Sequence, residues 1–122
     1  MHADSDFVVH LLEMLEPFGG VSAKKMFGGH GLFRDGLMFA LVADGVFFLK
    51  VDDENRAEFD ALDLPPFRFE TKNGKTGEMS YRQCPDDALE NPPAMTRWAE
   101  LAFAAALRNA AAKSTKKKKS KP

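Results

Sequence analysis

The sequence predicts an α+β domain of two layers, in which helices pack on an antiparallel sheet. Two Asp-Gly pairs, Asp35-Gly36 and Asp44-Gly45, each separate two runs of β-forming residues, which is the strongest short-range signal for a β-hairpin. Helical apolar periodicity marks the N-terminal segment and the alanine-rich segment after Pro92. The expected order is α-βββ-α-ββ-α. At 122 residues we expect one folded domain, residues 1–112, followed by a tail.

The first helix follows from the spacing of its apolar residues. Four of them recur every three or four positions: Phe7, Leu11, Leu15 and Phe18. Asp4, Ser5 and Asp6 supply an N-cap and the acidic first turn that a helix N-terminus favours. Together these residues predict a helix that Gly19-Gly20 ends.

Three strands are predicted next, at residues 26–34, 37–42 and 46–51. The two Asp-Gly turns join them into an antiparallel meander. In the second strand the residues that point to either face are apolar, which is typical of a central strand covered on both faces. Residues 28–31, with the sequence Gly-Gly-His-Gly, interrupt the first strand, and we interpret them as a bend or bulge.

The remaining elements follow from similar signals. Acidic residues 52–54 start a short helix that Pro65-Pro66 ends. Two further strands, residues 67–71 and 78–83, flank an Asn73-Gly74 turn. The last helix starts at Asn91-Pro92, because Asn caps a helix and Pro needs no N–H donor in its first turn. Its apolar positions are Met95, Trp98, Ala102 and Ala105.

Charge divides the chain into two parts. The last ten positions hold six lysines and no acidic residue: Lys113, Lys116, Lys117, Lys118, Lys119 and Lys121. Residues 1–112 therefore hold 11 basic and 18 acidic residues, a net charge of −7. We expect residues 113–122 to be disordered. This arm could touch nucleic acid weakly, whereas the acidic body repels phosphates elsewhere. The alternative is a solvated end that only keeps the protein soluble.

Several functional classes are excluded by composition. The apolar runs are far shorter than the roughly 20 residues of a membrane span, and the N-terminus lacks the pattern of a secretory signal. The single cysteine, Cys84, rules out an internal disulfide and a multi-cysteine metal site. His10 and Glu13 have the spacing of a bundle metal site, but the chain offers no second such pair. We therefore expect a cytoplasmic protein that has no metal or other cofactor.

One short segment carries a candidate anion-binding or partner-binding cluster: Lys24, Lys25, His30 and Arg34. Its glycines fit neither phosphate-binding template. Leu37 stands where a P-loop needs Lys, and Arg34 stands where the dinucleotide fingerprint needs Gly. A solvated surface is the favoured alternative for this cluster.

Catalysis is the weakest hypothesis. Cys84 with His10 or His30 could form a nucleophile–base pair, but no orienting signature surrounds Cys84. An inert thiol is the expected alternative, and Tyr81 and Trp98 are expected in a core or an interface. We assign no catalytic residue and predict that the protein is not an enzyme.

A longer stretch resembles a known family. Residues 24–36, with the sequence Lys-Lys-Met-Phe-Gly-Gly-His-Gly-Leu-Phe-Arg-Asp-Gly, are similar to the N-terminal domain of the TfoX/Sxy competence-regulator family. The likeness continues at residues 38–40 and 48–52, at Tyr81 followed by Pro85, and at Trp98-Ala99. It covers about residues 7–108 and implies the fold order given above.

The resemblance also bears on function. It implies no catalytic residues, and in two-domain members it implies a coactivator that acts with a cyclic-AMP-dependent transcription factor. Those members have a second domain where this chain has its lysine-rich segment. Our leading hypothesis is a cytoplasmic module that binds a protein partner, a transcription factor by resemblance, as a transcriptional accessory. The exposed edges of an open sheet also favour a homodimer.

Overall fold

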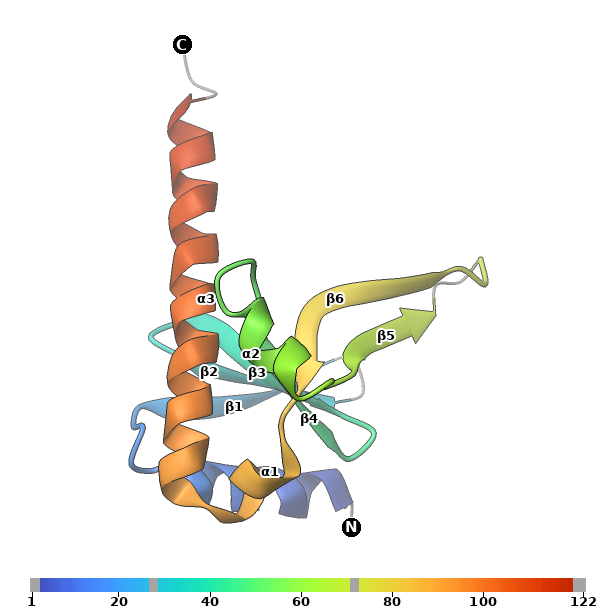
Figure 1. Ribbon diagram of the computed structural model, residues 1–122, viewed down its shortest axis with the longest axis vertical. Coiled ribbons are helices and arrows are strands. Elements are labelled where there is room, and N and C mark those ends of the chain that lie inside the picture. Colours follow the sequence, from blue (N-terminus) through green and yellow to red (C-terminus); the bar gives the residue numbers. More distant parts are fainter. Residues whose placement is uncertain (1–2, 27–28, 71–72, 120–122) are drawn as a thin grey trace.

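The computed structural model describes residues 3–26, 29–70 and 73–119 (Figure 1). This part of the chain forms three α-helices, a short 3-10 helix and one six-stranded antiparallel sheet, which confirms the α+β fold class. Along the chain the elements are α1 (Ala3–Met14), β1 (Val21–Met26), β2 (Gly29–Arg34), β3 (Leu37–Ala43), β4 (Val46–Lys50), α2 (Arg56–Ala61), β5 (Pro66–Glu70), β6 (Thr76–Gln83), η1 (Asp86–Glu90) and α3 (Pro92–Lys119).

The sheet has the spatial order β1-β2-β3-β4-β6-β5. Both predicted Asp-Gly hairpins are confirmed. Asp35 and Gly36 have φ angles of 52° and 79°, and Asp44 and Gly45 have φ angles of 51° and 74°. Two consecutive residues with positive φ match the right-handed twist of the paired strands, and Asp-Gly is among the sequences that adopt this geometry most readily.

The prediction of one long strand at residues 26–34 was wrong. The structure has two strands there, β1 and β2, which pair antiparallel with Met26 opposite Gly29. Phe27 and Gly28 lie outside the described residues. The sequence Val-Ser-Ala-Lys-Lys-Met of β1 carries little apolar alternation, because an edge strand has one neighbour and buries little surface.

The main core lies between the sheet and the helices α1 and α3. Phe39, Phe47 and Leu49 of the sheet are buried there against Leu11 of α1 and Met95 of α3. Residues 39–42 of β3 are all buried, which confirms a central strand covered on both faces. The predicted cap of α3 is also confirmed, since the Ala94 N–H donates to Asn91 Oδ1 at 3.2 Å.

Helix α3 is longer than the composition predicts. The sequence predicts a disordered arm from Lys113 on, whereas the backbone stays helical to Lys119. Alanine and lysine have favourable helix propensities, and no proline occurs between Pro93 and the end of the helix. In Figure 1 the C-terminal half of α3 continues past the rest of the body, and the β5–β6 hairpin projects away from it in another direction.

Within the described ranges, none of the helices combines the length and the apolar character that a membrane span requires.

Candidate functional site

The structure does not gather the four residues of the predicted cluster at one point. Lys25 and His30 are cross-strand neighbours in the β1–β2 ladder. Lys24 is the next residue to Lys25 and lies on the opposite face, with its Nζ 5.5 Å from the centre of the Phe33 ring. Only Lys25 and His30 are therefore adjacent, and anion binding by this cluster stays a prediction.

The side chain of Arg34 packs against two aromatic rings. Its guanidinium carbon lies 4.2 Å from the ring centre of Phe18 and 5.0 Å from that of Phe103. These two rings also contact each other, with centroids 6.0 Å apart. Cation–π contacts of this kind stabilise packing. Arg34 thus helps to hold the start of the sheet against α3.

A second apolar cluster lies on the other face of the sheet and contains strand residues only. Leu41, Phe48 and Tyr81 are buried, and partly buried side chains pack around them: Met38, Ala43, Val46 and Phe67. The rings of Phe48 and Phe67 are 5.0 Å apart, and Lys50 Nζ lies 5.0 Å from the centre of the Tyr81 ring. We call this surface the open face.

The open face extends towards the β1 edge through Gly31. A Cβ at Gly31 would lie within 3.1 Å of Met38 Sδ, the Phe33 ring and Met26 Sδ. Met26 and Phe33 are half-buried and therefore meet Met38 above the glycine, which adds two residues to the seven already named. Methionine adapts its shape to different partners, and phenylalanine supplies a large contact area.

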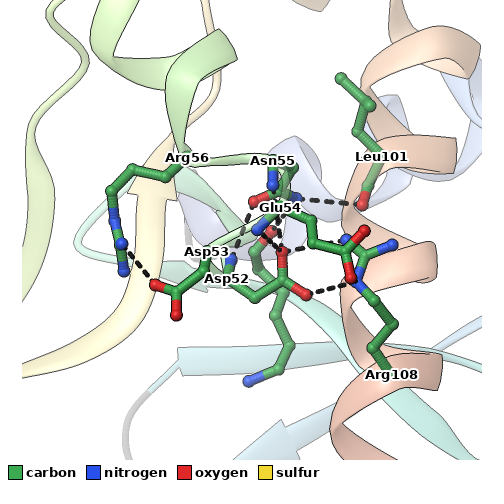
Figure 2. A network of polar contacts seen from close by, with 8 residues as sticks. Asp52, Asp53, Glu54, Asn55, Arg56, Leu101 and Arg108 are labelled. Carbon is green, nitrogen blue, oxygen red and sulfur yellow. Dashed lines mark hydrogen bonds and ion pairs between the residues drawn. The ribbon is translucent and has the colours of Figure 1, made fainter.

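The loop between β4 and α2 forms a polar network with α3 (Figure 2). Arg108 donates to the Asp52 carboxylate twice, from Nε at 2.6 Å and from Nη2 at 2.9 Å. The backbone N–H groups of Glu54 and Asn55 donate to Asp52 Oδ1 at 3.0 and 3.1 Å. These hydrogen bonds, that of Arg108 foremost, lower the pKa of Asp52 from its ordinary value.

Asn55 is the buried centre of this network and is 3% exposed. Its Oδ1 accepts from the Asp52 N–H at 2.8 Å. Its Nδ2 donates to the carbonyl oxygens of Lys50 at 3.2 Å and Leu101 at 3.0 Å. A single side chain therefore ties the end of β4 to the middle of α3.

A cavity of about 400 Å³ opens beside the network. Its lining includes Lys50 and Ser80 from the sheet and Arg108 and Asn109 from α3. Sequence reasoning missed this site, since Arg108 lies 56 positions from Asp52 and no local spacing connects them. The Asp52-x-x-Asn55 spacing could have indicated the loop turn but not its partner.

Cys84 and His10 are both engaged in local contacts. Cys84 is buried, its Sγ lies 3.5 Å from the carbonyl oxygen of Pro85, and burial raises its pKa to about 12. The thiolate of Cys84 that a nucleophile needs is therefore disfavoured at neutral pH. His10 Nε2 lies 2.8 Å from the Leu89 carbonyl oxygen. In the described part of the chain, no three His, Cys, Asp or Glu side chains come close enough to hold a metal ion.

Tyr81 and Trp98 are both buried, as the sequence predicts. Tyr81 belongs to the open face and Trp98 to the main core, where its ring lies 5.1 Å from that of Phe59. The phenol pKa of Tyr81 is raised to about 12 by burial. Both residues therefore fill packed regions of the molecule.

Comparison with known proteins agrees with the fold. No curated protein matches the chain. A family model described as the TfoX N-terminal domain matches residues 13–106. The match runs from the end of α1 through the sheet to the part of α3 that packs on it, and so it contains the open face and the Asp52 loop. This confirms the resemblance noted in the sequence: the chain belongs to the TfoX N-terminal domain family.

Proposed function

We propose that this chain is a non-enzymatic, cytoplasmic module that acts as a transcriptional accessory by binding a protein partner through the open face. The family supports a competence-regulator-like domain. The observation that favours the open face is its composition, since strand residues alone form this second apolar cluster. Leu41, Phe48 and Tyr81 are buried, so the part of this cluster that a partner can contact consists of its partly buried side chains, those of Met38, Ala43, Val46 and Phe67. Apolar side chains gathered at a surface are common at protein–protein interfaces.

The groups at the margin of the open face also suit a protein partner. The ammonium groups of Lys24 and Lys50 lie over aromatic rings at two places along the face. An interface in which a polar rim surrounds an aromatic and methionine-rich centre is the usual arrangement. A transcription factor is the class of partner that the family resemblance favours.

The test is co-purification with variants of half-buried open-face residues. Val46→Thr and Met38→Gln reduce the apolar surface and keep strand-compatible side chains. Val9→Thr is the matched control, because Val9 is 56% exposed on α1 and lies outside the open face. We expect a transcription factor to co-purify with the wild type and with Val9→Thr, and to be lost from the other two variants. Retention by all three variants would contradict the proposal.

A second candidate function is weak binding of nucleic acid by the lysine-rich end of α3. The observation that favours it is the helix itself, which carries residues 113–119 away from the acidic body. Lys121 lies outside the described residues. Deletion of residues 113–122 should abolish duplex DNA binding at low salt, and added salt should weaken wild-type binding steeply. Binding that is insensitive to both changes would exclude this function.

Self-association is a separate proposal about the sheet edges. β1 is an outer strand of the sheet, and an outer strand presents one row of its backbone groups to a second copy. Sedimentation should show a dimer at high protein concentration. Introduction of Pro at Ala23 in β1 should shift the chain to the monomer if that edge is used, and a wild-type monomer at all concentrations would refute the dimer.

A further inference from the structure

The open face carries two positive charges, one on each side of β2 and β3. Lys24 Nζ lies 5.5 Å from the centre of the Phe33 ring, and Lys50 Nζ lies 5.0 Å from the centre of the Tyr81 ring. Both rings belong to the open face. Among the residues that the structure describes, no carboxylate lies within ion-pair distance of either lysine. A partner that covers these rings therefore meets two cations that lack an anion.

The register of the sheet gives the separation of these lysines. One row of facing residues crosses four strands: Lys24, Gly31, Leu41 and Phe48. Lys50 is the second residue after Phe48 on β4, so its side chain points to the same face. Three strand spacings separate β1 from β4, which places the two lysines about 14 Å apart across the sheet. Apolar side chains of β2 and β3 fill the interval between them.

Acidic residues lie at the other two sides of the open face. Asp35 lies in the turn between β2 and β3, and Asp44 lies in the turn between β3 and β4, at the opposite end of β3. Both residues are exposed. The ends of the central strands are thus acidic, whereas the flanks at Lys24 and Lys50 are basic. An acidic partner is therefore attracted to a path across the strands and repelled from a path along them.

The backbone beneath the open face is already paired. Strands β2, β3, β4 and β6 each lie between two neighbours, so their N–H and C=O groups bond within the sheet. A partner seated there gains contacts with side chains only, and it must satisfy its own backbone groups. A helix does so internally, and an apolar stripe along one side of a helix packs on a sheet, as α1 and α3 do on the other face.

We propose that the open face binds an amphipathic, acidic helix of the protein partner. Its apolar stripe covers the partly buried side chains of the face, and a carboxylate at each end of the stripe pairs with Lys24 or Lys50. Three helical turns span about 16 Å, which is close to the separation of the two lysines. This inference rests on the proposed function, since it specifies the chemistry of the partner at the same face.

Helical peptides of defined charge test the inference, with binding to the full chain measured by fluorescence anisotropy. The first peptide, of about 18 residues, has leucines along one side and a glutamate at each end of that side, three turns apart. The second peptide has lysines in place of the two glutamates. We expect the glutamate peptide to bind saturably and about tenfold more tightly than the lysine peptide, and added salt to weaken its binding.

Variants of the chain locate the contact. Lys24→Glu should weaken binding of the glutamate peptide about tenfold, and Lys50→Gln should weaken it several-fold. Lys25→Glu is the matched control, because Lys25 is an exposed neighbour on the same strand whose side chain alternates to the other face. This variant should bind within about twofold of the wild type. A peptide with one glutamate and one lysine should bind Lys24→Glu more tightly than it binds the wild type.

Several results would overturn the inference. They are a glutamate peptide that does not bind, equal binding of the two peptides, and equal weakening by Lys24→Glu and Lys25→Glu. Self-association of the chain that Lys24→Glu abolishes, without an effect on peptide binding, would assign the face to a second copy instead. If Lys24→Glu keeps the transcription factor that Met38→Gln loses, the proposed function stands and the acidic helix is wrong. Retention of the factor by Met38→Gln as well contradicts the proposed function itself.

Discussion

Arg108 and Asp52 form a two-point ion pair, in which Nε and Nη2 of the arginine each donate to one carboxylate oxygen. The pair is partly shielded, with the side chains 35% and 26% exposed. It joins α3 to the loop that follows β4. Parallel hydrogen bonds to a carboxylate are the strongest geometry available to arginine, and partial burial protects them from screening.

Replacement of this arginine should destabilise the fold. Arg108→Met should lower the free energy of unfolding by about 1–3 kcal/mol, because charge-assisted bonds of this kind contribute that much when they are partly buried. The measurement is urea denaturation at pH 7. Arg56→Met is the control, since its pair with Asp53 is much more exposed and should contribute less than about 1 kcal/mol. Equal effects of both variants would refute the special role of the Asp52 pair.

The same pair should make stability depend on pH in acid. The pKa of Asp52 is lowered in the folded state, chiefly by Arg108, so the unfolded chain binds this proton more readily. The stabilisation is therefore complete above the ordinary pKa of 3.8 and is lost as the pH falls through the folded-state pKa. Urea denaturation of the wild type and Asp52→Asn should differ most at pH 5–7, and the difference should shrink as the pH falls below the ordinary pKa of 3.8. A constant difference over this range would contradict the assignment.

Asn55 should tolerate substitution poorly. Asn55→Ala leaves the Lys50 and Leu101 carbonyl oxygens and the Asp52 N–H without their side-chain partner. Since the site is buried, we expect a loss of about 2–4 kcal/mol in the free energy of unfolding. Asn109→Ala on the exposed side of α3 should change it by less than about 0.5 kcal/mol. Thermal denaturation of the two variants would show whether the difference exists.

Gly29 should be the least replaceable glycine of the sheet. A Cβ there would collide with the carbonyl oxygen of Val42 on β3, and strand backbone cannot move away cheaply. Gly29→Ala should therefore destabilise the protein by more than about 2 kcal/mol, or prevent folding. Gly36→Ala has open space around it and should cost only about 1 kcal/mol, from its φ of 79°. Comparable stabilities of the two variants would disprove the close approach.

Cys84 should be unreactive in the folded protein. The thiol is buried, and its pKa of about 12 leaves very little thiolate at pH 8. Labelling with a disulfide reagent should be slow in buffer, where its rate is set by opening of the fold, and it should be complete in 6 M guanidinium. Stoichiometric labelling of the native chain within minutes would contradict this and would restore interest in Cys84 as a nucleophile.

The sequence predicts local structure well and contacts between distant segments poorly. The turns at Asp35-Gly36 and Asp44-Gly45 and the cap at Asn91 depend on neighbouring residues, and all three are confirmed. Strand β1 was missed because an edge strand needs little apolar alternation. The network around Asn55 was missed because its partners come from β4 and α3 and meet only in the folded chain.

The candidate cluster shows the same limit at the level of a site. Proximity in sequence suggests that Lys24, Lys25, His30 and Arg34 act together. Strand alternation separates Lys24 from Lys25, and the aromatic contacts of Arg34 occupy its guanidinium. The ion pair that the fold does form, between Asp52 and Arg108, instead joins residues 56 positions apart. Tertiary packing, rather than spacing along the sequence, thus decides which charged residues share a site.

Two attachments on one helix have a mechanical consequence. The Leu101 carbonyl and the Arg108 guanidinium are held seven residues apart on α3, which is about 10 Å along the helix axis. Because α3 is bonded to the body at two separated points, it can neither slide along its axis nor rotate about it. The last turns of α3, up to Lys119, therefore leave the body in one set direction. A molecule that binds both the body and this end must match that direction, so the loop after β4 sets the geometry of any such complex.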